Sequence, residues 1–503
     1  MDTIDSATPR RSTSPFDVGD QAQLFVDQVL VRSAESISFT LHPARKHPLN
    51  PLLKAEFPWE GWRLEIYGSV IYDEESRLFK MWYLGETPDI PDYPLLYATS
   101  RDGVHWEKPF VGAVSYAKAD KHNIVATGLL LASVIRDSRD PDPQRRYKMI
   151  CTSMRDREKY PWGDYETFVS ADGLHWEPCS RGPIAPWADV ITGYYDRRLG
   201  LYVGFPKNHT ADIPGLPHPR RAFYVTTSRD FKTWTAPELA IYSDLRDDAG
   251  SLARIEEVRP ILDVPDNPAL VRTEFYGVGV YQAESCTVGF PWVFTVNNEA
   301  RFGNQEGPGE LQLAVSRDLR HWDRPFRTPC VTRGKLGEWD CGFFVTSAEA
   351  LRVGDEVWLY YGGSNYTHGT PCLYQAEGTG RGAPFTGSIG LAIWTVDRFV
   401  SADGPAEGGT LTTVPIVYDG TSLEINASAR PGGAVSVELL EADGRLIESS
   451  LPMEGDNLRH CVRWQTPTDL ARYAGAAVVL RFSIRNAQLF SFAFRHTRAD
   501  HPQ

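Results

Sequence analysis

The sequence predicts an all-β protein in which a five-bladed β-propeller is followed by a C-terminal β-sandwich. Two observations predict the propeller: a short signature recurs five times, and a pair of alternating segments precedes each copy. Between the copies, no segment keeps the 3.6-residue periodicity of an amphipathic helix. The chain has 503 residues, more than one hydrophobic core usually organises, so we expect two domains or three.

The recurring signature combines Ser, Asp and Trp within eight positions. It reads T-S-R-D-G-V-H-W at 99–106, V-S-A-D-G-L-H-W at 169–176, T-S-R-D-F-K-T-W at 227–234 and V-S-R-D-L-R-H-W at 315–322. A degenerate copy, W-T-V-D-R-F, stands at 394–399, and we align its Asp397 with the other aspartates. Asp and Gly favour a tight turn, and the Trp returns to pack on its own sheet, so each copy predicts a β-hairpin.

A second hairpin precedes each copy of the signature. The clearest one runs over 70–73, turns at 74–77 and returns over 78–83. The other four pairs are 134–137 with 147–150, 194–196 with 199–205, 278–282 with 291–296, and 348–352 with 357–361. Each unit thus has four strands, and four-stranded sheets repeated radially form a β-propeller. The alternative is a β-sandwich with chance repeats, which the five-fold recurrence disfavours.

The composition changes after Gly404. A linker, P-A-E-G-G, occupies 405–409, and short strands follow it up to residue 498. We therefore expect a disordered tail over 1–20, a catalytic propeller over 21–404 and a β-sandwich over 405–503. The sandwich either covers one side of its neighbour or binds carbohydrate.

Charge and cysteine usage exclude several classes of partner. The net charge is −13, from 52 basic and 65 acidic residues, which disfavours nucleic acid or an anionic membrane surface as a partner. No run of about 18 apolar residues predicts a membrane span. The first 20 residues lack the apolar core of a signal peptide, and the seven scattered cysteines contain no C-x-x-C pair. We expect free thiols in a reducing cytoplasm, and the oligomeric state is left open.

Carboxylates mark the starts of the predicted inner strands. In a propeller these strands line a central funnel, so side chains at their starts converge although they are far apart in sequence. Four of the five starts carry a carboxylate, namely Glu65, Asp189, Glu274 and Asp340. Glycoside hydrolysis uses such groups, because one carboxyl protonates the leaving oxygen and a second attacks the anomeric carbon or activates water. For each residue the alternative is a solvated turn residue or a cap on backbone amides.

The predicted roles follow from the neighbours of these residues. Glu274 is the expected general acid, since Thr273 and Tyr276 flank it, and Asp189 and Asp340 are expected to serve as base or nucleophile and to support the transition state. The expected substrate-binding residues are Glu65, Tyr67, Asn123, Trp187, Tyr276, Trp339 and His368. His368 follows a glycine-rich stretch, where functional residues are often found.

No cofactor and no metal are expected. His42 and His47 stand five residues apart in a proline-containing stretch, which predicts loop contacts rather than a metal site. No G-x-S-x-G elbow is present, and no glycine-rich loop follows a strand and opens a helix as nucleotide binding would require.

Several of these features together resemble a known clan. The five-fold repeat, the N-P-L-L segment at 50–53 and the Y-G-x-x-x-Y-D hairpin at 67–73 resemble glycoside hydrolases of families 32, 43, 68 and 130, and most closely bacterial family 32-like proteins. The resemblance covers about residues 21–498. It implies action on furanosides such as fructosides or arabinosides, with three acidic residues on inner strands. The family 32 motif W-M-N-D-P-N-G is absent, and R-D-P at 139–141 falls in a predicted proline-rich turn.

We therefore expect a glycoside hydrolase, exo-acting on a furanoside or a small oligosaccharide. A carbohydrate-binding propeller without catalysis is the alternative, because a fold does not determine a function. A phosphorylase or a lyase is a third possibility. A phosphorylase needs cations beside the acids to hold phosphate, and Lys207, His209 and Arg301 are the candidates. Retention or inversion stays open, since the sequence does not give the separation of the carboxyl groups.

Overall fold

The computed structural model describes residues 14–90, 92–156, 158–160, 163–179, 184, 189–301, 305–369 and 384–496. In these ranges β-strands dominate, and the α-helices are the short α1 (Leu245–Ala249) and α2 (Ser251–Val258). The prediction of an all-β protein is confirmed. No described helix is long and apolar enough to cross a membrane, and the six described cysteines are free thiols.

Most strands belong to five antiparallel units. Unit one contains β6 (Arg63–Asp73), β7 (Leu78–Glu86), β8 (Pro94–Ser100), β9 (Trp106–Glu107) and β10 (Ile124–Thr127). Unit two contains β11 (Leu129–Arg136), β12 (Tyr147–Ser153), β13 (Asp164–Ser170) and β14 (Glu177–Pro178). Unit three contains β15 (Ile191–Asp196), β16 (Leu201–His209), β17 (Arg221–Ser228) and β18 (Glu238–Ile241).

The last two units are less regular. Unit four contains β19 (Arg272–Gln282), β20 (Thr287–Val296), β23 (Gly309–Leu311), β24 (Ala314–Ser316) and β25 (Trp322–Asp323), and the small hairpin β21 (Asn298–Glu299) and β22 (Gln305–Glu306) extends from it. Unit five contains β26 (Phe343–Thr346), β27 (Leu351–Val353), β28 (Glu356–Ser364) and β29 (Gly387–Thr395). Its outer strand is β5 (Arg45–Lys46), which pairs with β29 and comes from the other end of the chain.

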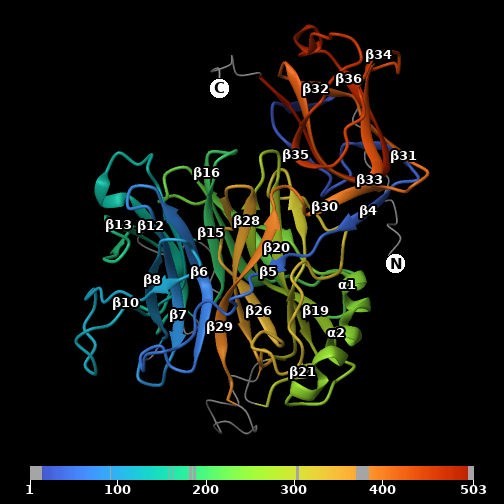
Figure 1. Ribbon diagram of the computed structural model, residues 1–503. Helices are drawn as coiled ribbons and strands as arrows, with labels where there is room; N and C mark the ends of the chain where they lie inside the picture. Colours follow the sequence, from blue (N-terminus) through green and yellow to red (C-terminus); the bar gives the residue numbers. More distant parts are fainter. Residues whose placement is uncertain are drawn as a thin grey trace.

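The first strands of the units close a ring. β6 contacts β11, β11 contacts β15, β15 contacts β19, β19 contacts β26, and β26 contacts β6 again. In Figure 1 the units form the larger, lower body, from blue (unit one) through green to orange (unit five). Buried tryptophans join neighbours: Trp82 Nε1 donates to the Gly173 carbonyl at 2.8 Å, and Trp292 Nε1 donates to Thr346 Oγ1 at 3.0 Å. The number of units matches the repeat, and the five-bladed propeller stays our interpretation of this ring.

The two ends of the ring differ. A cavity of about 670 Å³ is lined by the ends of β6, β11, β15 and β19, by the turns that follow them and by β27 with the residues before it. Its lining residues include Glu74, Arg139, Arg197, Glu284 and Arg352. The strand ends therefore gather at one mouth of the ring, and the strand starts, which carry the predicted carboxylates, lie at the other.

The recurring signature builds the same turn in four copies. In the first, Asp102 Oδ1 accepts hydrogen bonds from the backbone N–H groups of Val104 and His105, each at 2.8 Å. Asp172, Asp230 and Asp318 repeat this pattern. The next residue has a left-handed backbone, namely Gly103, Gly173, Phe231 and Leu319 with φ of 75°, 80°, 61° and 66°. In the fifth copy the left-handed residue is Asp397 itself (φ 63°), so its predicted alignment with the other aspartates was wrong by one position.

Both ends of the chain form the smaller, upper body of Figure 1, where blue and red strands lie together. In it β1 (Phe16–Gly19), β2 (Gln23–Leu24), β3 (Val31–Glu35) and β4 (Ser38–Leu41) pair with β32 (Ile416–Tyr418), β36 (Val478–Arg495), β31 (Gly409–Thr413) and β30 (Val400–Gly404). The long β33 (Ser422–Glu441) pairs with β34 (Leu446–Ser449), β35 (Asp456–Cys461) and β36. We call these strands the C-terminal sheet. Its interpretation as a β-sandwich stays a prediction.

The predicted boundaries differ from this arrangement. The sequence predicted a disordered tail up to residue 20 and a propeller from residue 21, but residues 16–41 belong to the C-terminal sheet. The physical reason is that these strands pair with β30, β31, β32 and β36 and add Val18, Phe25 and Leu30 to the core of that sheet.

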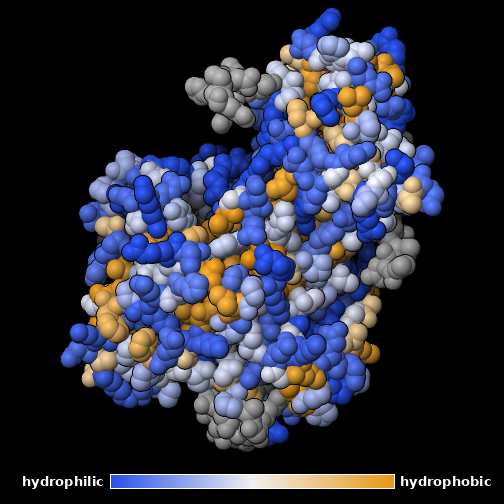
Figure 2. Space-filling model, in the orientation of Figure 1, coloured by the Kyte–Doolittle hydropathy of each residue, from blue (hydrophilic) through white to orange (hydrophobic). Residues whose placement is uncertain are grey.

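The C-terminal sheet attaches at the mouth where the strand ends gather. Arg495 pairs with Glu284 at 2.8 Å, and a small cavity there is lined by Glu284 and Asp397 of the ring together with Glu424 of the sheet. Figure 2 shows the smaller body set on one upper corner of the larger one, with a largely hydrophilic surface and apolar residues gathered over the middle of the larger body. The starts of the first strands therefore lie away from the C-terminal sheet.

Candidate active site

Glu65 and Glu274 stand on the first strands of units one and four, in the same local structure. Each belongs to a Glu-x-Tyr-Gly sequence. The pairing register of β6 with β7 shifts after Glu65, and that of β19 with β20 shifts after Phe275. The shift requires glycine, because a Cβ at Gly68 would lie 2.0 Å from the Trp82 carbonyl oxygen. The Glu65 carboxyl lies near the phenol of Tyr67 in its own motif and, after the larger effect of burial, raises the pKa of that phenol.

The Glu65 carboxyl has an environment that favours its protonated form. Its Oε1 accepts a hydrogen bond from Arg63 Nη1 at 2.9 Å, and 19% of its side chain is exposed. Burial raises the pKa of Glu65, Arg63 opposes this, and the nearby Glu86 adds to the rise. The net result is a pKa above the ordinary value for a glutamate, as a proton donor needs.

The Asp189 carboxylate, just before β15 in unit three, has the opposite environment. Half of its side chain is exposed, and its Oδ1 lies 2.5 Å from Lys207 Nζ. Burial alone would raise the pKa of Asp189, but the charge and hydrogen bond of Lys207 outweigh it and lower the pKa. Lys207 itself is buried, with its ammonium 3.9 Å from the centroid of the Tyr276 ring. Asp189 is therefore held as the charged carboxylate.

Glu65 and Asp189 face the same pair of phenols, although they come from different units. Both carboxyls raise the pKa of Tyr67 and of Tyr276, in each case after the larger effect of burial. The four side chains therefore lie within electrostatic range of one another. We call Glu65, Tyr67, Asp189, Lys207, Arg221, Glu274, Tyr276 and His368 the carboxylate cluster.

Glu274 is fully buried between two guanidinium groups. Arg221 Nη1 lies 2.5 Å from Oε2, and Arg272 Nε lies 2.7 Å from Oε1. Burial would raise the pKa of Glu274, but the two arginines outweigh it and lower the pKa. A general acid must carry a proton, so the predicted role of Glu274 as the acid does not fit its surroundings. Its side chain does lie beside Arg221, which also lowers the pKa of Asp189, and its part in catalysis stays a prediction.

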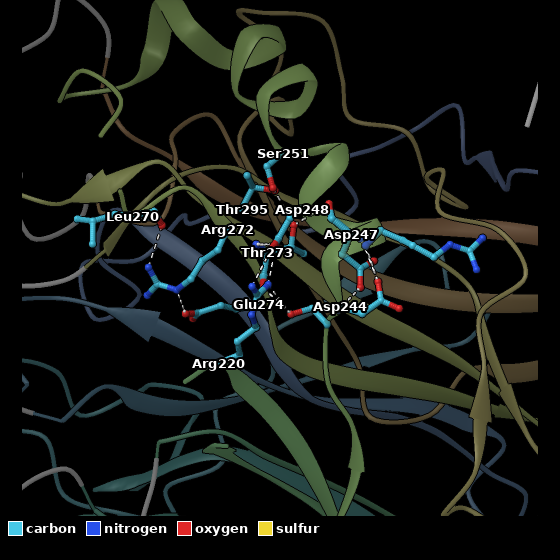
Figure 3. A network of polar contacts seen from close by, with 12 residues as sticks. Arg220, Asp244, Asp247, Asp248, Ser251, Leu270, Arg272, Thr273, Glu274 and Thr295 are labelled. Carbon is cyan, nitrogen blue, oxygen red and sulfur yellow. Dashed lines mark hydrogen bonds and ion pairs between the residues drawn. The ribbon is translucent and has the colours of Figure 1, made fainter. Parts of the chain in front are cut away.

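The short helices hold the strand start that carries Glu274. Asp248 accepts a hydrogen bond from the backbone N–H of Thr273 at 2.8 Å and binds Arg220 through both carboxylate oxygens, at 2.6 and 2.7 Å. Ser251 Oγ, on α2, lies 2.9 Å from Thr273 Oγ1. Figure 3 shows this network beside Glu274. A buried polar network of this kind fixes the position of a strand end.

His368 adds a neutral hydrogen-bonding group to the carboxylate cluster. Its ring centroid lies 4.8 Å from Tyr276, 4.7 Å from Phe294 and 5.3 Å from Phe343. Burial, with the charge of Arg221, lowers the pKa of His368 to about 3. The ring is therefore neutral near pH 7, and Nδ1–H donates to the Gln305 carbonyl at 2.9 Å. In that tautomer Nε2 is an acceptor, which suits a sugar hydroxyl.

Asp340 and Trp339, two of the predicted site residues, lie elsewhere. Asp340 is buried, with its carboxylate 2.5 Å from Lys46 Nζ and 2.8 Å from the Tyr361 hydroxyl, so it links β5 to unit five. Trp339 stacks on Tyr361 with the ring centroids 5.5 Å apart. Both residues precede β26 rather than stand on it, and their side chains turn towards the outer strands. Neither is part of the carboxylate cluster.

Asn123 is a structural residue of unit one. It is fully buried, accepts a hydrogen bond from Trp59 Nε1 at 2.7 Å, and donates to the Tyr83 hydroxyl at 2.8 Å and the Tyr97 carbonyl at 2.9 Å. Its amide is thus fully used within the core, which contradicts the predicted contact with substrate. Trp187, also predicted to bind substrate, lies outside the described residues.

The sequence reasoning missed the cations of the site. It did not consider Arg63 or Arg221, and it considered Lys207 only as a phosphate ligand. A signal was present, because Lys207 follows the largely apolar stretch 201–206 of β16 and a buried charge needs a partner. Among the described residues, no group of three or more His, Cys, Asp or Glu is placed to hold a metal ion.

No protein-family model and no curated protein sequence matches the chain. One similar solved structure is a thermostable family-43 glycoside hydrolase, with 14% identity, coverage of 67% of this chain and 92% of that chain, and a TM-score of 0.42. A second is an N-acetylgalactosamine deacetylase from F. plautii, with 15% identity, coverage of 77% of this chain and 96% of that chain, and a TM-score of 0.41. A third is a β-1,2-mannobiose phosphorylase from Listeria innocua, with 14% identity, coverage of 70% of this chain and 97% of that chain, and a TM-score of 0.40. The neighbours include glycoside hydrolases, the class that the sequence resemblance implies. Likeness at this level transfers neither a family nor an activity, so the function of this chain has to be inferred from its own contacts.

Proposed function

We propose that this protein is a glycoside hydrolase whose ring is a five-bladed β-propeller, with the C-terminal sheet as a β-sandwich covering its far mouth. One observation carries the proposal: Glu65 and Asp189 share one pair of phenols, and their surroundings move their pKa values in opposite directions. One carboxyl that is held protonated and another that is held ionised, both near the same two phenols, are what acid and base roles require.

In the proposed mechanism, Glu65 gives its proton to the oxygen of the leaving group. Asp189 then either attacks the anomeric carbon or takes a proton from the attacking water. Tyr67 and Tyr276 stay protonated, because burial raises the pKa of both, so they can donate hydrogen bonds to the sugar. Glu274 acts through Arg221, which it holds in the carboxylate cluster. The substrate remains a furanoside or a small oligosaccharide, as the sequence resemblance implies.

The test is release of aglycone from a panel of aryl furanosides and pyranosides. Asp189→Asn should lose about 10²-fold or more in kcat/KM on every active substrate. Glu65→Gln should lose as much on poor leaving groups such as 4-methoxyphenol, but much less on 2,4-dinitrophenol, which needs no proton. Asp340→Asn is the matched control, since that buried carboxylate lies outside the carboxylate cluster, and its folded fraction should keep kcat/KM. Equal loss on both leaving groups would remove Glu65 from the acid role.

Two other functions remain as outcomes of the same assay. Lys207 and Arg221 lie beside the carboxylates, as phosphorolysis would need, but each already pairs with an acid of the cluster. Product formation that depends on added phosphate would nevertheless favour a phosphorylase. Glycan binding without release on any substrate would favour a non-catalytic binding protein.

A further inference from the structure

The cavity of about 670 Å³ where the strand ends gather has the size of a small-molecule site. Its lining contains four arginines, four acidic residues and four tyrosines. The small cavity under the C-terminal sheet shares Glu284, Arg352 and Asp397 with it, so the two cavities meet at these residues. No residue of the carboxylate cluster lines it. The cavity is therefore a site of its own, at the other mouth of the ring.

Tyr281, near the end of β19, brings a buried hydroxyl to the wall of this cavity. It is 4% exposed and lines the cavity, and its hydroxyl forms no hydrogen bond with the part of the chain that the structure describes. Burial raises the pKa of Tyr281, and the charges of Asp397, Arg352, Glu284 and Arg197, which all line the cavity, act on its phenol. The phenol therefore keeps its proton near pH 7. Because buried polar groups are normally paired, this hydroxyl is available as a donor to a bound molecule.

A carboxylate and a guanidinium of this cavity have no ion-pair partner among the described residues. The charged lining residues that are paired are Arg136, Arg139, Arg197, Glu284 and Glu349. Glu74 is exposed to solvent, whereas Arg352 and Asp397 form no ion pair with any other described residue. Burial and the charge of Glu284 raise the pKa of Asp397, and the charge of Arg352 opposes them. Arg352 and Asp397 therefore lie within electrostatic range of each other, with opposite charges, at one cavity.

The opposite charges determine which kind of ligand fits. A simple anion would be attracted by Arg352 and repelled by Asp397 and Glu284, and a simple cation would meet the opposite balance. A neutral molecule would leave both charges without a counter-charge. A zwitterion satisfies both, because its ammonium can bind the carboxylate and its carboxylate can bind the guanidinium, with a hydrogen bond at each contact. Tyr72, which is 44% exposed, and Leu351 add apolar surface to the same lining.

We propose that this cavity binds a free α-amino acid with an apolar side chain. The ammonium of the amino acid binds the Asp397 carboxylate, and its carboxylate accepts hydrogen bonds from the Arg352 guanidinium and the Tyr281 hydroxyl. This function goes beyond glycoside hydrolysis and does not depend on it, since the cavity shares no residue with the carboxylate cluster.

Isothermal titration calorimetry with L-phenylalanine at pH 7.5 tests the site without any turnover. The wild type should bind one equivalent. Two probes of the same shape each lack one charge, namely 3-phenylpropionate, which has no ammonium, and 2-phenylethylamine, which has no carboxylate. Each should bind about 10-fold more weakly or worse, because each loses a hydrogen bond between charged groups.

Two variants should separate the two contacts. Asp397→Asn should weaken the binding of L-phenylalanine about 10-fold or more and leave that of 3-phenylpropionate unweakened. Arg352→Gln should weaken the binding of L-phenylalanine as much and leave that of 2-phenylethylamine unweakened. Asp443→Asn and Arg445→Gln, in an exposed hairpin turn of the C-terminal sheet, are the matched controls and should bind all three probes as the wild type does.

The crossed pattern, in which each variant affects only the probes that carry the group it binds, would support the amino-acid site. Absence of saturable binding of L-phenylalanine, or binding that both variants keep, would overturn it. Equal affinity for 3-phenylpropionate would show a simple anion site, and equal affinity for 2-phenylethylamine a simple cation site, and either result would overturn it too. Glycoside release is measured separately, so a failure of this site leaves the proposed hydrolase standing, and the reverse also holds.

Discussion

Replacing Asp397 by asparagine should stabilise the protein, and more so at neutral pH than in acid. Asp397 is partly buried where the ring meets the C-terminal sheet, and burial, with the nearby charge of Glu284, raises its pKa from 3.8 to about 6. Between these two values the folded state holds a proton that the unfolded state has lost. Stability therefore falls as the pH rises through this window and stays lower above it.

The magnitude follows from the size of the pKa shift. About two pKa units at 1.36 kcal/mol each amount to about 3 kcal/mol at pH 7, which is an upper limit because the carboxyl is partly exposed. Asparagine removes the charge and tolerates the left-handed backbone of this position. The expected gain for Asp397→Asn is therefore up to about 3 kcal/mol at pH 7.5 and close to zero at pH 3.5.

The measurement is chemical denaturation of the wild type and the variant at both pH values, followed by tryptophan fluorescence. Asp443→Asn, at an exposed hairpin turn of the C-terminal sheet, is the matched control and should change little at either pH. A gain of equal size at pH 3.5 and pH 7.5 would refute the reasoning, because it could not come from the titration of Asp397. A loss at pH 7.5 would refute it as well.

Three further predictions concern the carboxylate cluster and its surroundings. The pH profile of kcat/KM should be bell-shaped, with Asp189 controlling the acid limb and Glu65 the alkaline limb. The check is the profile of Glu65→Gln measured with a dinitrophenyl substrate. If the alkaline limb persists in that variant, the assignment fails. Glu274→Gln should lower the free energy of unfolding by about 3 kcal/mol, because it leaves buried arginine charges without a counter-charge, and equal thermal stability would contradict this. Asn123→Ala should lower the free energy of unfolding, measured by urea denaturation, by about 2 kcal/mol, because it leaves buried donors unsatisfied, and kcat should stay unchanged. A selective loss of kcat would restore the predicted role of Asn123 in substrate binding.

The sequence predicted those features that local chemistry determines. The Ser-x-Asp turns form wherever the signature is complete, since the aspartate binds backbone groups two and three residues ahead. Glu65, Asp189 and Glu274 could be located because the repeat gives the starts of the first strands. The repeat failed for Asp340, where the residues before β26 leave the strand and turn towards Lys46.

The roles of the carboxyls could not be read from the sequence, because distant partners determine them. The neighbours of Glu274 in sequence indicated an acid, but Arg221, 53 residues earlier, holds it ionised. Lys207 does the same for Asp189. The pairing of residues 16–41 was equally hidden, since it depends on strands that lie almost at the other end of the chain.

The position of the N-terminal strands has a consequence for the order in which the chain folds during synthesis. β1 to β4 leave the ribosome long before their partners in the C-terminal sheet, which follow only after Phe399, and β5 can pair only once β29 has been made. Residues 16–41 are thus made early but can pair only late, and the edges of their strands stay unpaired while the units of the ring form. Open edges invite pairing with other chains. The protein should therefore depend on chaperones during translation more than its finished, closed form suggests.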